Sequence, residues 1–193
     1  MQIIEKLNTE ESTHKVKILD IGCGKGFLGQ YLFESGFMKT TGMDCSNGIL
    51  EIARDKKCYH HLEHRVFGMK DTVIPQEMKN KYAFVSAATI LNNDGYDLNI
   101  FMNMVDCCEI GGFIVFATKL DLHSKNQYEP EINNLEQNGF WKFTSEHQFF
   151  RYDKLCGNVG SFSTKLVKVL CYQKIDHCQW LAEQIILNKL KDD

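Results

Sequence analysis

Residues 16–26 read Val-Lys-Ile-Leu-Asp-Ile-Gly-Cys-Gly-Lys-Gly, an apolar run that ends in an acid and passes into alternating glycines. The apolar part, 16–21, predicts a buried strand, and residues 27–35 predict a helix with its apolar side chains on one face. Because glycine has no Cβ, the turn between them can bring its backbone close to a ligand. The first N–H groups of the helix favour an anionic group there. The stretch therefore predicts a ligand-binding loop.

A second acid follows at the end of the next predicted strand, residues 40–44. Asp44 stands twenty residues after Gly24. A carboxylate at this position can accept hydrogen bonds from both hydroxyls of a ribose. Met43 and Cys45 flank it and are expected to contact the base. Together the two motifs predict a site for a nucleoside-bearing cofactor.

This combination resembles the S-adenosylmethionine (SAM) site of class I methyltransferases. The carboxylate of SAM suits the glycine loop, and its cationic part suits Asp20, through water. The loop after the third predicted strand should pass the adenine edge, and the residues after the fourth should line the methionine arm. The expected cofactor-binding residues are Asp20, Gly22, Cys23, Gly24, Gly26, Asp44, Cys45, Gly68, Met69, Ala88 and Thr89.

A dinucleotide fingerprint is an alternative interpretation, since residues 24–29 fit G-x-G-x-x-G. The position of Gly22 favours SAM, because the dinucleotide pattern would place its first glycine later than the strand end allows. A P-loop is excluded, since no G-x-x-x-x-G-K-[ST] occurs. A third interpretation is an α/β domain whose glycine loop is only a tight turn, but such a domain would not require Asp44.

The rest of the chain alternates strands with helices, which is typical of a parallel α/β sheet. Further strands are predicted at 64–67, 82–88 and 113–118, and further helices at 47–54, 97–108 and 129–138. Two longer segments, 141–151 and 163–173, predict an antiparallel hairpin. The predicted fold class is α/β: a Rossmann-like class I methyltransferase with a seven-stranded, mostly parallel sheet, a C-terminal antiparallel hairpin and helices on both faces.

One more helix is predicted after the hairpin, at 177–190. Its apolar side chains, which share one side, are Cys178, Leu181, Ala182, Ile185 and Ile186. That side either packs on the domain or docks on a protein partner. We expect residues 1–176 to form one methyltransferase domain and 177–193 to be its helical extension.

The composition predicts a globular protein in a reducing compartment. A chain of 193 residues with 44% hydrophobic content can bury one core. Its net charge of -3 argues against general nucleic-acid binding, and no apolar run approaches the roughly 20 residues that span a bilayer. Because the first residues resemble no secretory or transit signal and the eight cysteines include no C-x-x-C pair, we expect a cytoplasmic protein with reduced thiols. An organellar import route is the alternative.

Residues 60–64 read His-His-Leu-Glu-His and offer metal-ligating side chains. No further ligands cluster near them in the sequence, which favours a solvated loop before a short strand. No metal is therefore expected.

The stretch from about 16 to 174 resembles the methyltransferase-like protein 27 family, also called the Williams–Beuren syndrome chromosomal region 27 family. The resemblance rests on the two cofactor motifs, on Gly111 and Gly112 before a strand, and on Leu-Glu-Gln-Asn-Gly-Phe-Trp at 135–141. It implies a SAM-dependent methyltransferase. Family members usually carry a longer helical segment over the cofactor, whereas about 15 residues precede Val16 here. They also commonly carry an aspartate where Ala83 stands. Both departures affect how the active site closes over its ligands, and they therefore bear on whether the protein catalyses methyl transfer.

The expected function is SAM-dependent methyl transfer to a small-molecule or protein acceptor. The alternative is a non-catalytic methyltransferase-fold subunit of a larger assembly. Methyl transfer mainly needs alignment and exclusion of water, so no catalytic residue is assigned. Residues 92–95, Asn-Asn-Asp-Gly, either orient a polar acceptor or form a turn. Arg151 and Tyr152 are candidates for the acceptor pocket, and His147 is a candidate base for which a structural role is favoured.

Overall fold

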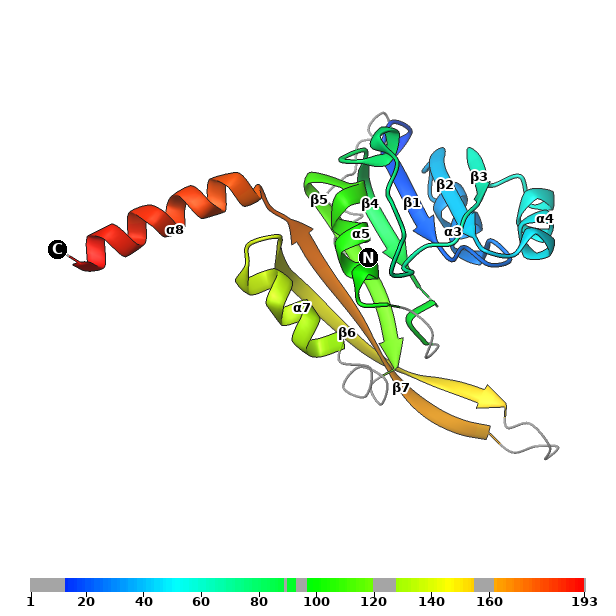
Figure 1. Ribbon diagram of the computed structural model, residues 1–193. Coiled ribbons are helices and arrows are strands. Elements are labelled where there is room, and N and C mark those ends of the chain that lie inside the picture. The colour runs from blue at the N-terminus through cyan, green and yellow to red at the C-terminus, as the bar shows by residue number, and fades with distance from the viewer. Residues whose placement is uncertain (1–12, 89, 93–96, 120–127, 155–161, 193) are drawn as a thin grey trace.

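The computed structural model describes residues 13–88, 90–92, 97–119, 128–154 and 162–192 (Figure 1). One seven-stranded sheet has the order β3-β2-β1-β4-β5-β7-β6. Six strands run in one direction, and β7 runs against its neighbours β5 and β6. The strands are β1 (Lys17–Ile21), β2 (Lys39–Asp44), β3 (His61–His64), β4 (Tyr82–Ala87), β5 (Cys108–Lys119), β6 (Trp141–Lys154) and β7 (Phe162–Lys174).

Helices cover both faces of this sheet. On one face, Leu32 and Phe37 form a small core with Ile18 of β1. On the other face, a large core joins Leu19 and Val85 to Phe101. The predicted fold class is therefore confirmed. The helices are α3 (Phe27–Glu34), α4 (Asn47–Asp55), α5 (Asn99–Cys107), α7 (Tyr128–Gln137) and α8 (His177–Asp192), with short 3-10 turns η1 (Gln76–Met78) and η2 (Ile90–Asn92).

Trp141, at the start of β6, lies within the larger core and is fully buried. Its ring stacks on Tyr172 of β7, with centroids 4.6 Å apart, and meets Phe101 of α5 edge-on at 6.1 Å. The indole N–H donates a hydrogen bond of 3.1 Å to the carbonyl of Ile132 in α7. One side chain thus joins the C-terminal hairpin to two helices.

The third strand lies earlier than the predicted range 64–67. Residues 61–64 pair with residues 41–44 of β2 instead. Val66 and Phe67, whose apolar character suggested a strand, line a pocket. β5 also starts at Cys108 rather than at 113.

α8 leads away from the sheet (Figure 1). Three of its predicted apolar side chains, Cys178, Leu181 and Ala182, are exposed and do not pack on the domain, whereas those of Ile185 and Ile186 lie outside the described residues. The first turn does contact the body, because a Cβ built on Gly139 would lie 2.1 Å from the ring of Trp180. No helix among the described residues has the length and apolarity to cross a bilayer.

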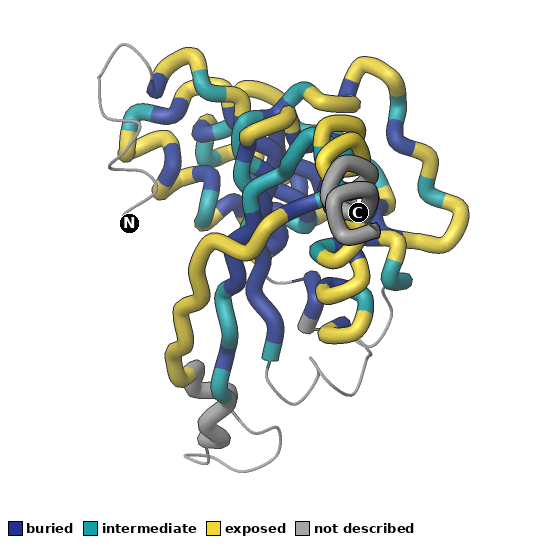
Figure 2. The backbone as a smooth tube through the Cα atoms, turned by 90° about the vertical axis from the view of Figure 1, so that its left-hand side faces the viewer, coloured by how far each residue is buried: buried dark blue, intermediate teal, exposed yellow. Residues whose placement is uncertain are grey.

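The edge strand β6 faces solvent, and its residues 142–150 are all exposed (Figure 2). The parallel strands β1, β2 and β4 are mostly buried. The seven described cysteines are free thiols.

Candidate functional site

The glycine-rich loop leaves the carboxyl end of β1 and enters α3. Gly22, Gly24 and Gly26 have φ angles of 68°, 54° and 78°, a region that other residues rarely adopt. A Cβ built on Gly22 would also lie only 1.8 Å from Cγ2 of Ile90. The amide of Cys23 donates to the carbonyl of Met43 at 2.8 Å, which fastens the loop to β2.

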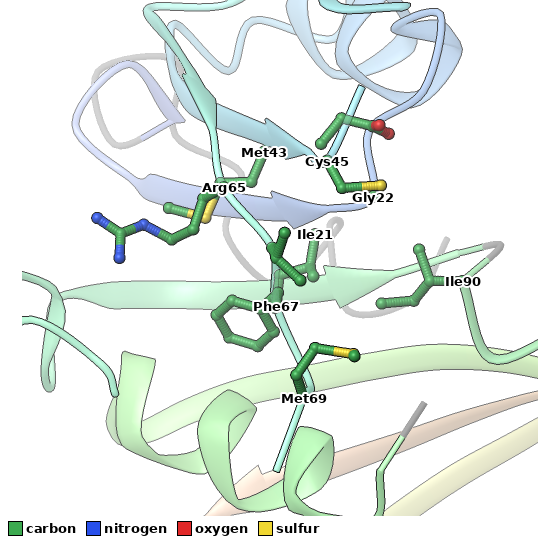
Figure 3. Close-up of a pocket in the computed structure, with 10 residues that line it drawn as sticks. Ile21, Gly22, Met43, Cys45, Arg65, Phe67, Met69 and Ile90 are labelled. Carbon is green, nitrogen blue, oxygen red and sulfur yellow. The ribbon is translucent and has the colours of Figure 1, made fainter. Parts of the chain in front are cut away.

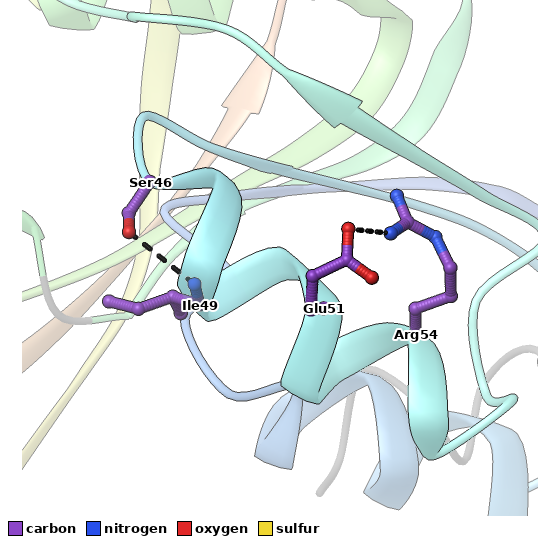
Figure 4. Close-up of polar contacts among 4 residues, drawn as sticks. All are labelled: Ser46, Ile49, Glu51 and Arg54. Carbon is purple, nitrogen blue, oxygen red and sulfur yellow. Dashed lines mark hydrogen bonds and ion pairs between the residues drawn. The ribbon is translucent and has the colours of Figure 1, made fainter.

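Asp44 lies at the carboxyl end of β2, beside this loop. Its Oδ2 accepts a hydrogen bond from the Gly24 amide at 3.0 Å, and its Oδ1 accepts one from the Ser46 amide at 2.9 Å. The hydroxyl of Ser46 then caps α4 by accepting from the Ile49 amide at 3.4 Å (Figure 4). A carboxylate can accept about four hydrogen bonds, so Asp44 can hold the loop and still accept from a ligand.

A cavity of about 280 Å³ opens next to Asp44 (Figure 3). We call it the Asp44 pocket, and its lining residues are Ile21, Gly22, Met43, Asp44, Cys45, Arg65, Val66, Phe67, Met69 and Ile90. Its walls are mainly apolar. The guanidinium of Arg65 points away from this apolar wall and pairs with Glu63 at 2.6 Å. An apolar cavity beside one carboxylate suits a flat heterocycle attached to a hydroxylated sugar.

Asp20, predicted to complement the cationic part of the cofactor, lies beneath the loop with 1% of its surface exposed. The hydroxyl of Tyr59 donates to its Oδ2 at 2.8 Å, and the hydroxyl of Ser86 donates to its Oδ1 at 3.1 Å. Burial raises the pKa of Asp20 to about 6, and the neighbouring Asp44 adds to this increase, while the two hydrogen bonds oppose it. Asp20 is thus a buried carboxyl that titrates near neutral pH.

The other predicted site residues divide into two groups. Cys45 and Met69 line the Asp44 pocket. Cys23 is buried, and this burial raises the pKa of its thiol to about 12, so the thiol stays protonated at neutral pH. Gly68 packs against α5, where an added Cβ would lie 2.8 Å from Ile100. Ala88 is exposed just after β4, and Thr89 lies outside the described residues.

Sequence patterns did not point to Phe67 and Tyr59. Ile90 is one of the residues after β4 that were expected to line the methionine arm, and it lines the Asp44 pocket. Tyr59 has no motif around it, but Gly29 inside a helix and Gly42 inside a strand were signals, because such glycines often mark the close approach of another group.

Comparison with known proteins shows which family this chain is similar to. Residues 18–112 match the family model of the methyltransferase domain. The chain is 27% identical to methyltransferase-like protein 27 of Homo sapiens over 132 residues, which are 67% of this chain and 52% of that protein. This relative supports the resemblance found in the sequence. A malonyl-[acyl-carrier protein] O-methyltransferase of Priestia megaterium is 40% identical over 57 residues, 28% of this chain and 20% of that protein. The chain thus spans about half or less of the length of these curated relatives.

Solved methyltransferase structures share the fold of this chain. The magnesium protoporphyrin IX methyltransferase of Synechocystis PCC 6803, which has SAM bound, aligns with a TM-score of 0.56 at 11% identity, covering 88% of this chain and 76% of that chain. The N-methyltransferase NodS of Bradyrhizobium japonicum WM9, in complex with S-adenosyl-L-homocysteine (SAH), aligns with a TM-score of 0.59 at 14% identity, covering 91% and 85%.

Proposed function

We propose that this methyltransferase domain binds SAM at the glycine-rich loop and the Asp44 pocket, and transfers its methyl group to a small-molecule or protein acceptor. The observation that carries the proposal is the Asp44 carboxylate, which is fastened to the Gly24 amide and borders the apolar pocket. A structural turn alone would not require a carboxylate at this point.

The residues present fit the parts of the cofactor. The adenine would enter the apolar part of the Asp44 pocket, and the ribose hydroxyls would donate to Asp44. At about 280 Å³, the pocket is just below the ~300–1,000 Å³ usual for ligand sites. It therefore suits the nucleoside, and we expect the methionine arm to extend along the glycine loop. The negative charge of Asp20 beneath the loop favours a cationic ligand.

SAM supplies a methyl group on an electron-poor sulfur, so the protein needs mainly to orient donor and acceptor and exclude water. Among the described residues that line the pocket there is no histidine or lysine, so none of them is assigned as a catalytic base. His147 lies on the exposed edge strand and does not line the pocket. Residues 93–95, which were considered as residues that orient the acceptor, lie outside the described residues. The side chains of Asn92, Arg151 and Tyr152, the other candidates for contact with the acceptor, lie outside them as well. The acceptor class is therefore proposed from the family alone.

The test is a calorimetric titration of the purified chain with SAM and with SAH. We expect micromolar binding of both, and at least a tenfold weaker affinity in Asp44→Asn, because an amide cannot accept at both of its atoms. The matched control is Asp55→Asn, which removes an exposed carboxylate at the end of α4 and should change affinity less than twofold. A folded protein that binds neither ligand would overturn the proposal and favour a subunit without cofactor.

A further inference from the structure

Tyr59 lies between α4 and β3, outside the predicted cofactor motifs, and its hydroxyl makes two hydrogen bonds. It donates to Oδ2 of Asp20 at 2.8 Å and accepts from the amide of Gly29 at 3.1 Å. Asp20 is the penultimate residue of the strand that leads into the glycine loop, and Gly29 belongs to the first turn of the helix that follows the loop. One hydroxyl thus connects both ends of the loop.

The ring of Tyr59 fits a slot that exists because three residues lack side chains. A Cβ built on Gly29 would lie 2.1 Å from its Cζ, and one on Gly42 would lie 2.8 Å from its Cε1. A Cβ on Gly26 would lie 3.1 Å from its Cε2. These glycines come from α3, β2 and the loop itself. The surroundings thus permit little movement of the ring.

The bond to Gly29 also affects how α3 begins. Gly26 is the N-cap residue and has no side chain to accept from the first turn, so the first amides lack partners within the helix. The Tyr59 hydroxyl accepts from Gly29. Among the described residues, the amides of Phe27 and Leu28 donate no hydrogen bond. Tyr59 thus accepts from the amide of Gly29, and the amides of Phe27 and Leu28 stay available to an anionic group at the loop.

We propose that Tyr59 is a positioning residue for cofactor binding, which holds the glycine loop and the Asp20 carboxylate in the orientation that SAM requires. This inference rests on the SAM site proposed above. Tyr59 does not line the Asp44 pocket, so it acts through the loop and through Asp20.

The charge of Asp20 provides a readout that a role in packing alone would not affect. The groups that face or interact electrostatically with this carboxyl are Tyr59, Ser86, Cys23, Cys58 and Asp44. The Tyr59 hydrogen bond favours the ionised form, because it donates to the carboxylate. Its removal should therefore raise the pKa of Asp20 above its value of about 6. Since SAM is cationic and SAH lacks the sulfonium charge, protonation of Asp20 should lower the affinity for SAM more than the affinity for SAH.

The experiment compares Tyr59→Phe with Tyr31→Phe, which alters an exposed tyrosine of α3. Dissociation constants for SAM and SAH are measured by calorimetry from pH 5 to pH 8, after circular dichroism has shown that each variant is folded. We expect Tyr59→Phe to weaken SAM about tenfold at pH 7. We also expect the loss of SAM affinity at low pH to set in at a higher pH than in the unaltered chain. Tyr31→Phe should match the unaltered chain within twofold.

Each outcome decides between the hypotheses. If the unaltered chain binds neither ligand, the SAM site itself fails and Tyr59 has no such role. If it binds SAM but Tyr59→Phe has the same affinity and pH profile, the positioning role alone is wrong. If Tyr59→Phe does not fold, Asp20→Asn replaces it. This variant must bind SAM more weakly and without the low-pH transition, and an unchanged affinity and profile would overturn the proposal.

Discussion

Gly22 and Gly48 differ sharply in the space that surrounds them. A Cβ on Gly22 would meet Ile90 at 1.8 Å, and the φ angle of Gly22 is 68°. A Cβ on Gly48, in the first turn of α4, would have no atom within 4 Å. The same chemical change therefore has opposite consequences at the two positions.

We expect Gly22→Ala to lower the free energy of unfolding by about 2–3 kcal/mol, because it adds both a clash and backbone strain. Gly48→Ala should raise it by up to about 1 kcal/mol, since alanine restricts the unfolded chain and favours the helix. Urea denaturation measures both values. A Gly22→Ala protein as stable as the unaltered chain would show that Ile90 moves aside without cost.

Asp20 should make stability depend on pH. Its pKa is raised from 3.8 to about 6 in the folded chain, so between these values the folded state holds a proton that the unfolded state releases. Rising pH therefore weakens the contribution of Asp20 to folding, and the loss is complete above pH 6. An uncharged asparagine can accept from Tyr59 at its Oδ1 and donate from its Nδ2 to the Ser86 hydroxyl, whose proton can turn to the Leu19 carbonyl 3.3 Å away.

Asp20→Asn should thus be more stable than the unaltered chain by about 1–3 kcal/mol at pH 7, although it should bind SAM more weakly. The excess in its free energy of unfolding over that of the unaltered chain should grow from pH 4 to pH 6 and then stay level, as measured by urea denaturation at each pH. A difference that is constant or falls across this range would contradict the prediction, and Asp55→Asn serves as the control for a change in net charge.

Sequence patterns predicted those site features that depend on neighbours along the chain. The glycine loop and Asp44 were predicted because a strand, a turn and a second strand end bring them together in any parallel sheet. Tyr59 was missed, since its partners Gly29 and Asp20 are 30 and 39 residues away. The burial of Asp20 was missed for the same reason.

At the scale of elements, the hairpin is tied to the parallel half of the sheet by Lys174, at the end of β7. Its Nζ donates to the carbonyls of Val105 and Cys108 at 2.7 Å and 2.9 Å, and to Oδ1 of Asn80 at 2.6 Å. The two carbonyls lie at the C-terminal end of α5, where a cation also complements the helix dipole. Burial lowers the pKa of Lys174, and the three acceptors keep the ammonium in place.

Lys174→Met should lower the free energy of unfolding by about 2–3 kcal/mol, because the acceptors lose a charged donor. Lys142→Met, at an exposed position of β6, should change it by less than about 0.5 kcal/mol. Thermal or urea denaturation provides the comparison. Equal losses in the two variants would mean that Lys174 contributes no more than a surface lysine.

Element boundaries were predicted less well than element types. Strand β3 was placed too late because Val66 and Phe67 are more apolar than the residues that form it. An edge strand with one neighbour needs little apolar character, so His61–His64 gave only a weak signal. The hydrophobicity of residues 66 and 67 serves the pocket instead.

At the scale of the whole molecule, the candidate site and the C-terminal helix occupy separate parts of the chain. The Asp44 pocket is lined by residues between Ile21 and Ile90. The described contacts of α8 with the body involve its first turn, where His177 stacks on Phe140 at 4.3 Å and Trp180 covers Gly139.

Deletion of residues 177–193 should therefore leave the affinity for SAM within twofold and lower the melting temperature by only a few degrees, as expected for a loss of about 1 kcal/mol. Calorimetry and a thermal scan on the same sample measure both quantities. Loss of SAM binding by a folded truncated protein would show that α8 supports the site, contrary to its position in the fold.

The slot around Tyr59 also limits how this sequence can evolve. Gly26, Gly29 and Gly42 can gain side chains only if the ring beside them becomes smaller, and a smaller ring would leave a hole and an unsatisfied carboxyl. Single steps in either direction are therefore disfavoured. Gly26 is also restricted by its φ of 78°, and Gly42 by Leu62 at 2.8 Å, whereas the ring alone crowds Gly29. A homologue that has lost the tyrosine should therefore show a bulkier residue at the position of Gly29.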